Sequence, residues 1–268
     1  MAAKIYWLAS YPRSGNTWLR VLLAQVIYGK VRSSAEVAAY VPSIHHAING
    51  KHLMQRKAIV MKTHWPYRAA LPFRSEAAGA IYIVRHPVDV MASAIRYRFM
   101  ERGHHAEAVA PDELERKARE WAKVYLANRG APHWIREGYG RWDRNVGSWL
   151  NCRSMPVHVV RYEDLRDRTL ECLTGICLFL DAQAGKARLE QAVRNSTLES
   201  MNELERQEIA GDRRFLFRSS GKPKTAVPGL RFIASADSDE GRALALTDDE
   251  KQAARELFAD TMVKFGYD

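Results

Sequence analysis

The sequence has 268 residues, of which 47% are hydrophobic and 27% charged, and its formal net charge is +10. This composition suits one globular domain over residues 1–268, and the positive charge favours an anionic partner: a nucleotide, a nucleic acid or an acidic membrane surface. Three cysteines without metal-ligand spacing exclude a disulfide scaffold. No apolar stretch reaches the roughly 18 residues of a membrane span, and no signal peptide is recognised, so we expect a cytoplasmic protein with no integral membrane segment.

Short apolar runs alternate with helical segments along the chain. The predicted strands are Ile5–Ala9, Ala58–Met61, Ala80–Val84 and Val157–Val160. The predicted helices are Gly15–Tyr28, Pro87–Met100, Pro111–Asn128, Asp143–Cys152, Glu163–Leu180 and Asp248–Phe265, with loops at 101–111, 129–143 and 211–241. Strands that lack polar alternation and are separated by helices are typical of a parallel sheet buried on both faces. The sequence therefore predicts an α/β fold: an open parallel sheet with helices on both faces.

The segment Tyr11–Trp18 joins the first strand to the first helix and has the composition of an anion-binding turn. A helix N-terminus offers unpaired N–H groups and a partial positive charge. Gly15 would let the backbone approach an anion closely, and Arg13 adds a full charge. The segment is not a Walker A motif, because Asn16 follows Gly15 where that motif has lysine. An ordinary strand-to-helix turn with an N-cap is the alternative.

The second strand leads directly into Lys62 and His64. In an open parallel sheet, ligands bind at the carboxyl ends of the strands, so both side chains are expected near the first loop. A neutral histidine there can take a proton from a hydroxyl, and a lysine can stabilise developing negative charge. Taken alone, a histidine in this position is more often a surface or core-edge residue.

The third strand is followed by Arg85, Pro87, Asp89 and Ser93. Pro87 is well placed at the first position of a helix. Ser93 lies eight residues after Arg85, near the second turn of the predicted helix. The alternative is an arginine that pairs with Asp89 and a serine that faces solvent.

Two further segments complete the pattern. Tyr162 follows the fourth strand and is either a core aromatic residue or a ligand contact. Ser196 precedes the segment Leu198–Arg206 and is predicted to be its helix N-cap, which is compatible with a ligand contact.

Together these motifs resemble those of the sulfotransferases, which use 3′-phosphoadenosine 5′-phosphosulfate (PAPS) as sulfuryl donor. Their first loop usually reads Y-P-K-S-G-T-T-W, so this chain carries Arg13 for lysine and Asn16 for threonine. K-T-H, R-x-P-x-D-x-x-x-S and Y-E-D-L are also present, whereas T-S-F-x-x-M matches only in part, with Leu198 replacing an aromatic residue. The resemblance implies a P-loop-like fold and covers residues 5–28, 58–66, 80–101, 157–165 and 195–206.

The resemblance also implies a role for each matching residue. His64 is expected to be the general base for sulfuryl transfer, with Lys62 and Arg13 as further catalytic residues. The donor would be bound by Arg13, Ser14, Gly15, Asn16, Thr17, Trp18, Arg85, Ser93, Tyr162, Ser196 and Leu198, and by Arg218 and Gly221 of a late loop that matches weakly. PAPS is the expected co-substrate, and no metal is expected because protein cations take its role.

The acceptor is expected to be a hydroxyl group of a small molecule. The loops at 101–111 and 129–143 would lie over the sulfuryl end, and aromatic residues in the second suggest an aromatic compound or a natural product. The stretch Trp142–Trp149 and the short chain resemble bacterial members that modify natural products. A homodimer remains open.

Two other functions fit parts of the sequence. A P-loop-type nucleotide kinase or NTPase would need a lysine after Gly15 and a strand-end aspartate for Mg²⁺, and Asp164 is the nearest candidate. A basic nucleic-acid-binding protein would fit the net charge of +10, but the basic residues are dispersed and no known nucleic-acid module is present. We therefore expect no nucleic-acid partner.

Overall fold

The computed structural model describes residues 3–46, 57–101, 110–211, 215–217, 232 and 244–267. Its centre is a 4-stranded parallel sheet with the strand order β2-β1-β3-β4. The strands are β1 (Lys4–Ser10), β2 (Ala58–Thr63), β3 (Ala77–Val84) and β4 (Val157–Arg161). All the predicted strands are confirmed, and each is slightly longer than expected.

Side chains of the central strands alternate between two hydrophobic cores, one on each face of the sheet. Leu8, Ile81 and Ile83 belong to the first core, whereas Trp7 and Tyr82 belong to the second. Because both faces are buried, the strands need no polar side. The predicted α/β fold, an open parallel sheet with helices on both faces, is confirmed.

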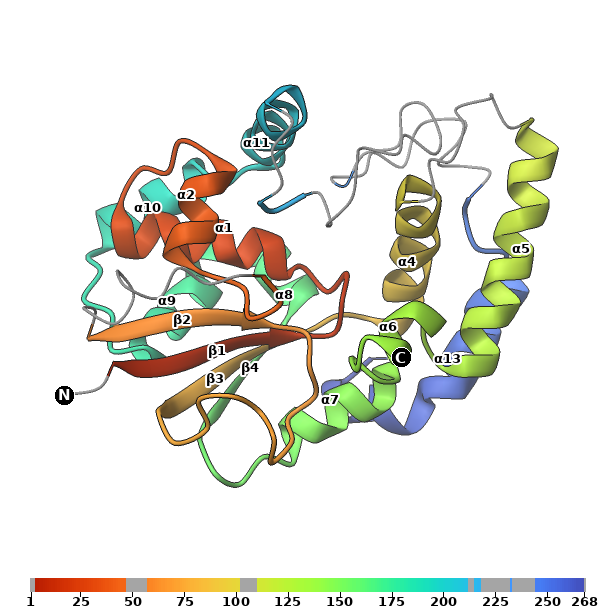
Figure 1. Ribbon diagram of the computed structural model, residues 1–268, viewed down its shortest axis with the longest axis horizontal. Coiled ribbons are helices and arrows are strands. Elements are labelled where there is room, and N and C mark those ends of the chain that lie inside the picture. The colour runs from red at the N-terminus through yellow and green to blue at the C-terminus, as the bar shows by residue number, and fades with distance from the viewer. Residues whose placement is uncertain are drawn as a thin grey trace.

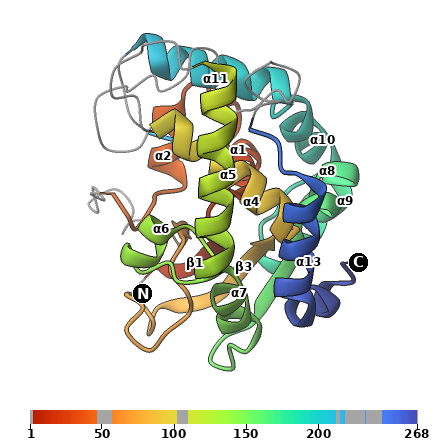
Figure 2. The same cartoon turned by 90° about the vertical axis from the view of Figure 1, so that its right-hand side faces the viewer.

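Each core is completed by its own set of helices. The first core is covered by α1 (Asn16–Tyr28), α2 (Ser34–Tyr40), α8 (Tyr162–Asp167), α9 (Thr169–Phe179), α10 (Lys186–Arg194) and α11 (Leu198–Ala210). The second is covered by α4 (Pro87–Glu101), α5 (Pro111–Asn128), α6 (Pro132–Arg136), α7 (Trp142–Leu150) and α13 (Asp248–Met262), which continues into the 3-10 turn η1 (Val263–Phe265). Figure 1 shows α1, α2 and α10 above the sheet and α4, α5 and α13 at the right. Figure 2 shows α5 passing in front of α4.

The helices of the structure differ from the prediction in three respects. The predicted helix Glu163–Leu180 is two helices, because Arg168 has φ −133° and ψ 47° and interrupts the helical path. The predicted loop 129–143 contains α6, and α7 begins at Trp142 within it. Helices α2 and α10 were not predicted, since each buries only a pair of side chains and so lacks an apolar stripe. Most of the predicted loops 101–111 and 211–241 lies outside the described residues.

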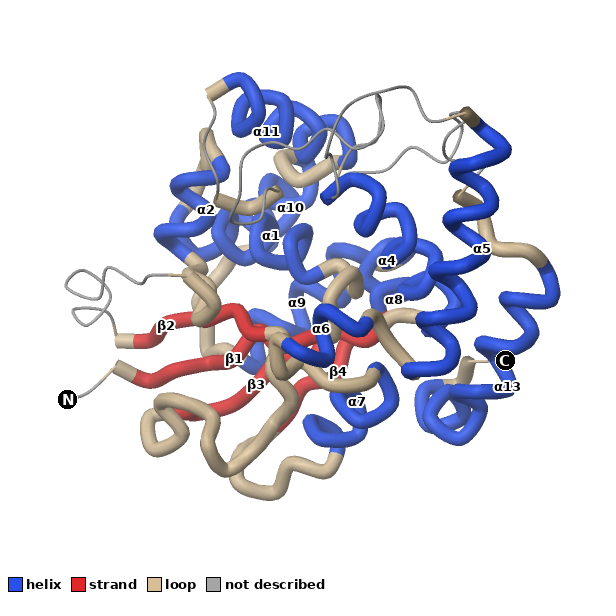
Figure 3. Tube along the Cα trace, turned by 45° about the vertical axis from the view of Figure 1, so that its right-hand side comes forward, coloured by secondary structure: helices blue, strands red, loops and turns tan. Residues whose placement is uncertain are grey.

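The strand order places a ligand site at one edge of the sheet. The chain passes from β1 to β2 on one side of β1, then returns to β3 on its other side. Neighbouring loops at such a reversal diverge and leave a crevice at the carboxyl ends of the strands. Figure 3 shows α1 and α9 packed against the sheet and α4 and α8 beside its β4 side.

Candidate active site

A cavity of about 1090 Å³ lies at the carboxyl ends of the strands and is lined by residues that follow all of them. Its wall includes most of the residues predicted from the sequence: Arg13, Gly15, Asn16, Thr17, Trp18, Lys62, His64, Arg85, Ser93, Tyr162, Ser196 and Leu198. Ser14 is buried behind this wall. Arg218 and Gly221 lie outside the described residues. The fold therefore brings together segments that are far apart in sequence.

The loop between β1 and α1 is held in one shape by Gly15 and Asn16. Gly15 has φ +95°, and a Cβ at this position would overlap the ring of Tyr162. The Asn16 side chain turns toward β1, where Nδ2 donates to Leu8 O (3.2 Å) and Ser10 Oγ (3.1 Å). The loop thus leaves its backbone N–H groups, rather than the Asn16 amide, as donors to a ligand at the start of α1.

Arg13 links the first loop to helix α4. Its Nε donates to Ser93 Oγ (2.9 Å) and its Nη2 to Phe232 O (3.0 Å). The guanidinium lies over the rings of Tyr97 (5.0 Å) and Phe232 (4.1 Å). Burial lowers the pKa of Arg13 to about 10, so the side chain is charged at neutral pH. Nη1 is buried without a partner among the described residues and remains as a free donor.

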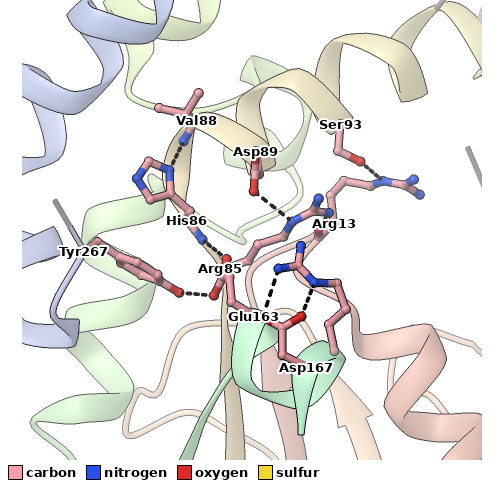
Figure 4. Close-up of polar contacts among 10 residues, drawn as sticks. Arg13, Arg85, His86, Val88, Asp89, Ser93, Glu163, Asp167 and Tyr267 are labelled. Atoms are coloured by element: carbon pink, nitrogen blue, oxygen red, sulfur yellow. Dashed lines mark hydrogen bonds and ion pairs between the residues drawn. The ribbon is translucent and has the colours of Figure 1, made fainter. Parts of the chain in front are cut away.

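Arg85 connects the end of β3 to the first loop (Figure 4). Its Nη1 donates to Arg13 O (3.2 Å), and its guanidinium carbon lies 4.5 Å from the centre of the Tyr162 ring. The alternative contact with Asp89 is present but long, with Nε 3.9 Å from the carboxylate. Arg85 therefore lies on the cavity wall even though it contacts Asp89.

Glu163 fixes the turn between β3 and α4 from below (Figure 4). Its Oε1 accepts from the backbone N of His86 (3.0 Å), and its Oε2 accepts from the hydroxyl of Tyr267 (2.7 Å). The Tyr267 ring also packs against His86 and Arg161. These contacts connect the end of the chain to the segment that carries Arg85.

His64 lies just after β2 and is held by its Nδ1, which donates to Ser10 O (2.9 Å). A carbonyl oxygen can only accept a hydrogen bond, so this contact assigns the proton to Nδ1 and leaves Nε2 with a free lone pair. Burial, together with the charge of Lys62, holds the pKa of His64 well below its usual value. Burial also lowers the pKa of Lys62 to about 7, with a further contribution from the charge of Arg20. The pair is therefore a neutral base beside an amine that changes charge near neutral pH.

Sequence reasoning missed His45, Asn145 and Arg20. The backbone N of His64 donates to His45 Nε2 (2.8 Å), and the two rings stack 5.8 Å apart. Asn145 Nδ2 donates to His64 O (2.9 Å), and Arg20 donates to Val41 O through two nitrogens. None of them lies in a recognisable motif, and only the distances in the fold relate them to His64.

The far end of the cavity is formed by Trp18 and the start of α11. Trp18 Nε1 donates to Ser196 O (2.7 Å), and its ring meets Tyr162 edge to face at 6.2 Å. The predicted N-cap Ser196 is wrong: Thr197 caps α11, with its side chain accepting from Ser200 N. Leu198 keeps 65% of its surface exposed. Ser196 Oγ is instead buried without a partner among the described residues.

The unpaired polar atoms of this region fit a ligand that carries several acceptors. Ser14 Oγ, Ser196 Oγ, Arg13 Nη1 and Arg85 Nε are buried and lack a hydrogen-bond partner in the described part of the chain. Buried polar groups are normally paired, so these atoms are available to a ligand with several hydrogen-bond acceptors. No cluster of three metal-ligating side chains occurs among the described residues. No described helix is long and apolar enough to cross a membrane.

Comparison with known proteins identifies the family. A family model described as "Sulfotransferase domain" matches residues 4–224. The chain belongs to the sulfotransferase family. Guinea pig (Cavia porcellus) 3-alpha-hydroxysteroid sulfotransferase is 26% identical over 208 residues, 73% of this chain and 65% of that protein. Mouse (Mus musculus) Sulfotransferase 1B1 is 26% identical over 209 residues, 73% of this chain and 64% of that protein. The chain thus spans less than two thirds of the length of these curated relatives.

Solved structures of other proteins share the fold. Mouse sulfotransferase SULT7A1 complexed with PAP superimposes with a TM-score of 0.62 at 20% identity, over 97% of this chain and 84% of that chain. Retinol dehydratase in a complex with retinol and PAP gives a TM-score of 0.62 at 14% identity, over 98% and 82%. The P-loop-like α/β fold that the sequence resemblance implied is confirmed.

Proposed function

We propose that this protein transfers a sulfuryl group from PAPS to a hydroxyl group of a small molecule. The observation that carries the proposal is a single cavity that is lined both by the neutral His64 with Lys62 and by the cationic loop and strand-end residues Arg13 and Arg85. The family supports it, as do two neighbouring structures whose descriptions include PAP, the donor without its sulfuryl group.

His64 is the general base in this proposal. Its Nε2 lone pair takes the proton of the acceptor hydroxyl while Nδ1 stays hydrogen-bonded to Ser10 O. The acceptor oxygen forms a bond to sulfur as the bond from sulfur to the 5′-phosphate oxygen breaks, and that oxygen leaves with the electron pair. Sulfuryl transfer, like phosphoryl transfer, depends mainly on positioning and charge stabilisation.

The cations and the first loop stabilise the charge that moves during this step. Lys62 contacts the sulfuryl oxygens, and the backbone of the loop with Thr17 and Ser14 holds the 5′-phosphate. Arg13 supports the leaving oxygen and also reaches Ser93. These groups replace a metal ion in the proposed scheme.

The remaining residues place the nucleotide. Arg85 and Ser93 bind the 3′-phosphate, and Gly15 and Asn16 let the loop approach the 5′ end. Trp18 and Tyr162 flank the base together with Ser196 and Leu198, whose side chains lie in the same wall. The unpaired oxygen of Ser196 supports this arrangement. Arg218 and Gly221 remain proposed contacts of the late loop.

The acceptor lies between His64 and an aromatic wall formed by Trp65, Trp134 and Tyr139. Flat or apolar compounds gain most from such a wall, so we propose a phenol or a hydroxylated natural product as acceptor. Curated relatives include a sulfotransferase named for 3-alpha-hydroxysteroids, which supports an apolar acceptor.

We also propose a cytoplasmic location and a homodimer for this protein. All three cysteines are free thiols, which favours a reducing cytoplasm. A homodimer is tested by light scattering during size-exclusion chromatography, with a monomer mass of 30.5 kDa as the reference.

Sulfation assays with PAPS and a phenol such as 4-nitrophenol test the reaction, with His64→Ala as the decisive variant. Loss of a general base lowers turnover by about 10²–10⁴-fold. PAP binding should persist, because His64 has no proposed contact with the nucleotide. Turnover near the wild-type value in His64→Ala would contradict the role of His64. Mg²⁺-dependent ATP hydrolysis without sulfation would favour the kinase or NTPase alternative.

A further inference from the structure

Three arginines line the cavity together with Ser93, and one of them, Arg96, belongs to no motif. Arg96 lies one helical turn after Ser93 on α4, so both side chains share a face of the helix. Both line the cavity together with Arg13 and Arg85. Because the guanidinium groups lie near one another, the charges of Arg85 and Arg96 both lower the pKa of Arg13. The charge of Arg85 likewise lowers the pKa of Arg96.

Among the described residues, the positive charge of Arg13, Arg85 and Arg96 exceeds the negative charge that faces them. Asp89 lies 3.9 Å from Arg85 Nε and also faces Arg96, while Glu205 faces Arg13 and accepts from the backbone N of Phe232. Within the described part of the chain, Arg96 makes no ion pair, and its Nε is buried without a partner. Unpaired guanidinium donors at a cavity wall suit a phosphate, which accepts several charge-assisted hydrogen bonds.

We propose that Arg96 binds the 3′-phosphate of the donor nucleotide and is a specificity-determining residue for nucleotides phosphorylated at that position. The inference rests on the proposed donor site at Arg85 and Ser93 and adds a cation to it. Arg96 extends from a regular helix, so its contribution does not depend on the residues 218–222 of the late loop.

Binding of PAP and of adenosine 5′-phosphate (AMP), which differ only in the 3′-phosphate, tests this role by calorimetry. Arg96→Gln should weaken PAP by about 10- to 100-fold and leave AMP within about twofold of wild type, because only the charged contact is lost. Arg96→Lys should recover part of the loss. Arg98→Gln is the matched control, since Arg98 lies on the same helix but stacks 5.1 Å from the Trp121 ring, and its PAP affinity should match the wild type.

The outcomes separate this inference from the donor site itself. If Arg85→Ala loses the preference for PAP over AMP and Arg96→Gln keeps it, the role of Arg96 is overturned and the proposed function stands. Equal weakening of PAP and AMP binding in Arg96→Gln would also overturn this role. Arg96 would then stabilise helix α4 and would not contact the 3′-phosphate. A wild-type protein that does not distinguish PAP from AMP would overturn both proposals.

Discussion

Lys62 and His64 are two residues apart, and burial lowers the pKa of both side chains. The lower pKa keeps the histidine in its neutral form but reduces the positive charge of the lysine. His64 remains neutral, so it is ready to accept a proton. Lys62, with a pKa of about 7, loses much of its charge above neutral pH until an anion lies beside it. A bound phosphate or sulfuryl group raises the pKa of the amine and so links ligand binding to proton uptake.

This linkage predicts that binding of PAPS, which carries the sulfuryl group that Lys62 contacts, takes up close to one proton at pH 8, whereas binding at pH 6 takes up much less because Lys62 is already charged. Calorimetry in buffers with different ionisation enthalpies measures the number of protons. Lys62→Gln should abolish the uptake at pH 8, and Lys57→Gln, an exposed lysine just before β2, should retain it. Uptake that persists unchanged in Lys62→Gln would show that another group is the source.

At the scale of elements, the connection between β1 and α1 depends on the fit of Gly15 against Tyr162. The glycine is in a left-handed conformation, which costs other residues about 1–2 kcal/mol. Here the ring of Tyr162 also occupies the space that a side chain would need. The loop shape, the first turn of α1 and the wall beside Arg85 are therefore coupled through one contact.

Gly15→Ala is expected to lower PAP affinity by at least about 10-fold, because either the loop or the Tyr162 ring must move. Gly29→Ala is the matched control: Gly29 has φ +88°, but a Cβ there would meet no atom within 4 Å. That variant should lose about 1 kcal/mol of stability and keep its PAP affinity. Calorimetry and thermal unfolding of both variants provide the comparison. Equal loss of PAP affinity in the two variants would contradict the role of the Tyr162 contact.

At the scale of the whole molecule, the buried histidines link the site to stability in acid. Burial lowers the pKa of His45 to about 3, and that of His64 is also well below its usual value. The unfolded chain therefore binds more protons than the folded chain between about pH 6.5 and pH 3. Their contribution to stability is complete above pH 6.5 and falls as the pH falls below it.

The melting temperature should accordingly fall between pH 7.5 and pH 5.5, and less in His45→Gln than in the wild type. The glutamine oxygen can still accept from the backbone N of His64, but it does not bind a proton. At pH 5.5 the difference amounts to about 1 kcal/mol, or about 2–4 °C. Thermal unfolding across this range checks it, and identical pH slopes would show that His45 is not held neutral by the fold.

The sequence predicted the strands and the residues at their ends better than the helices and the supporting contacts. Parallel strands buried on both faces form continuous apolar runs, and motif residues such as Arg85 directly follow them. Short helices such as α2 lack a strong periodic pattern. The contacts of His45 and Asn145 with His64 join distant segments, so they become visible only when the chain is folded.

Calorimetry of PAP against ADP tests whether this cavity recognises a nucleotide by its 3′-phosphate. The wild type should bind PAP more tightly by about 10- to 100-fold, because ADP lacks the group that Arg85 and Ser93 contact. Arg85→Ala should lose much of that preference and still bind ADP. Equal binding of both nucleotides by the wild type, or binding of neither, would show that this cavity is not a site for a 3′-phosphorylated nucleotide.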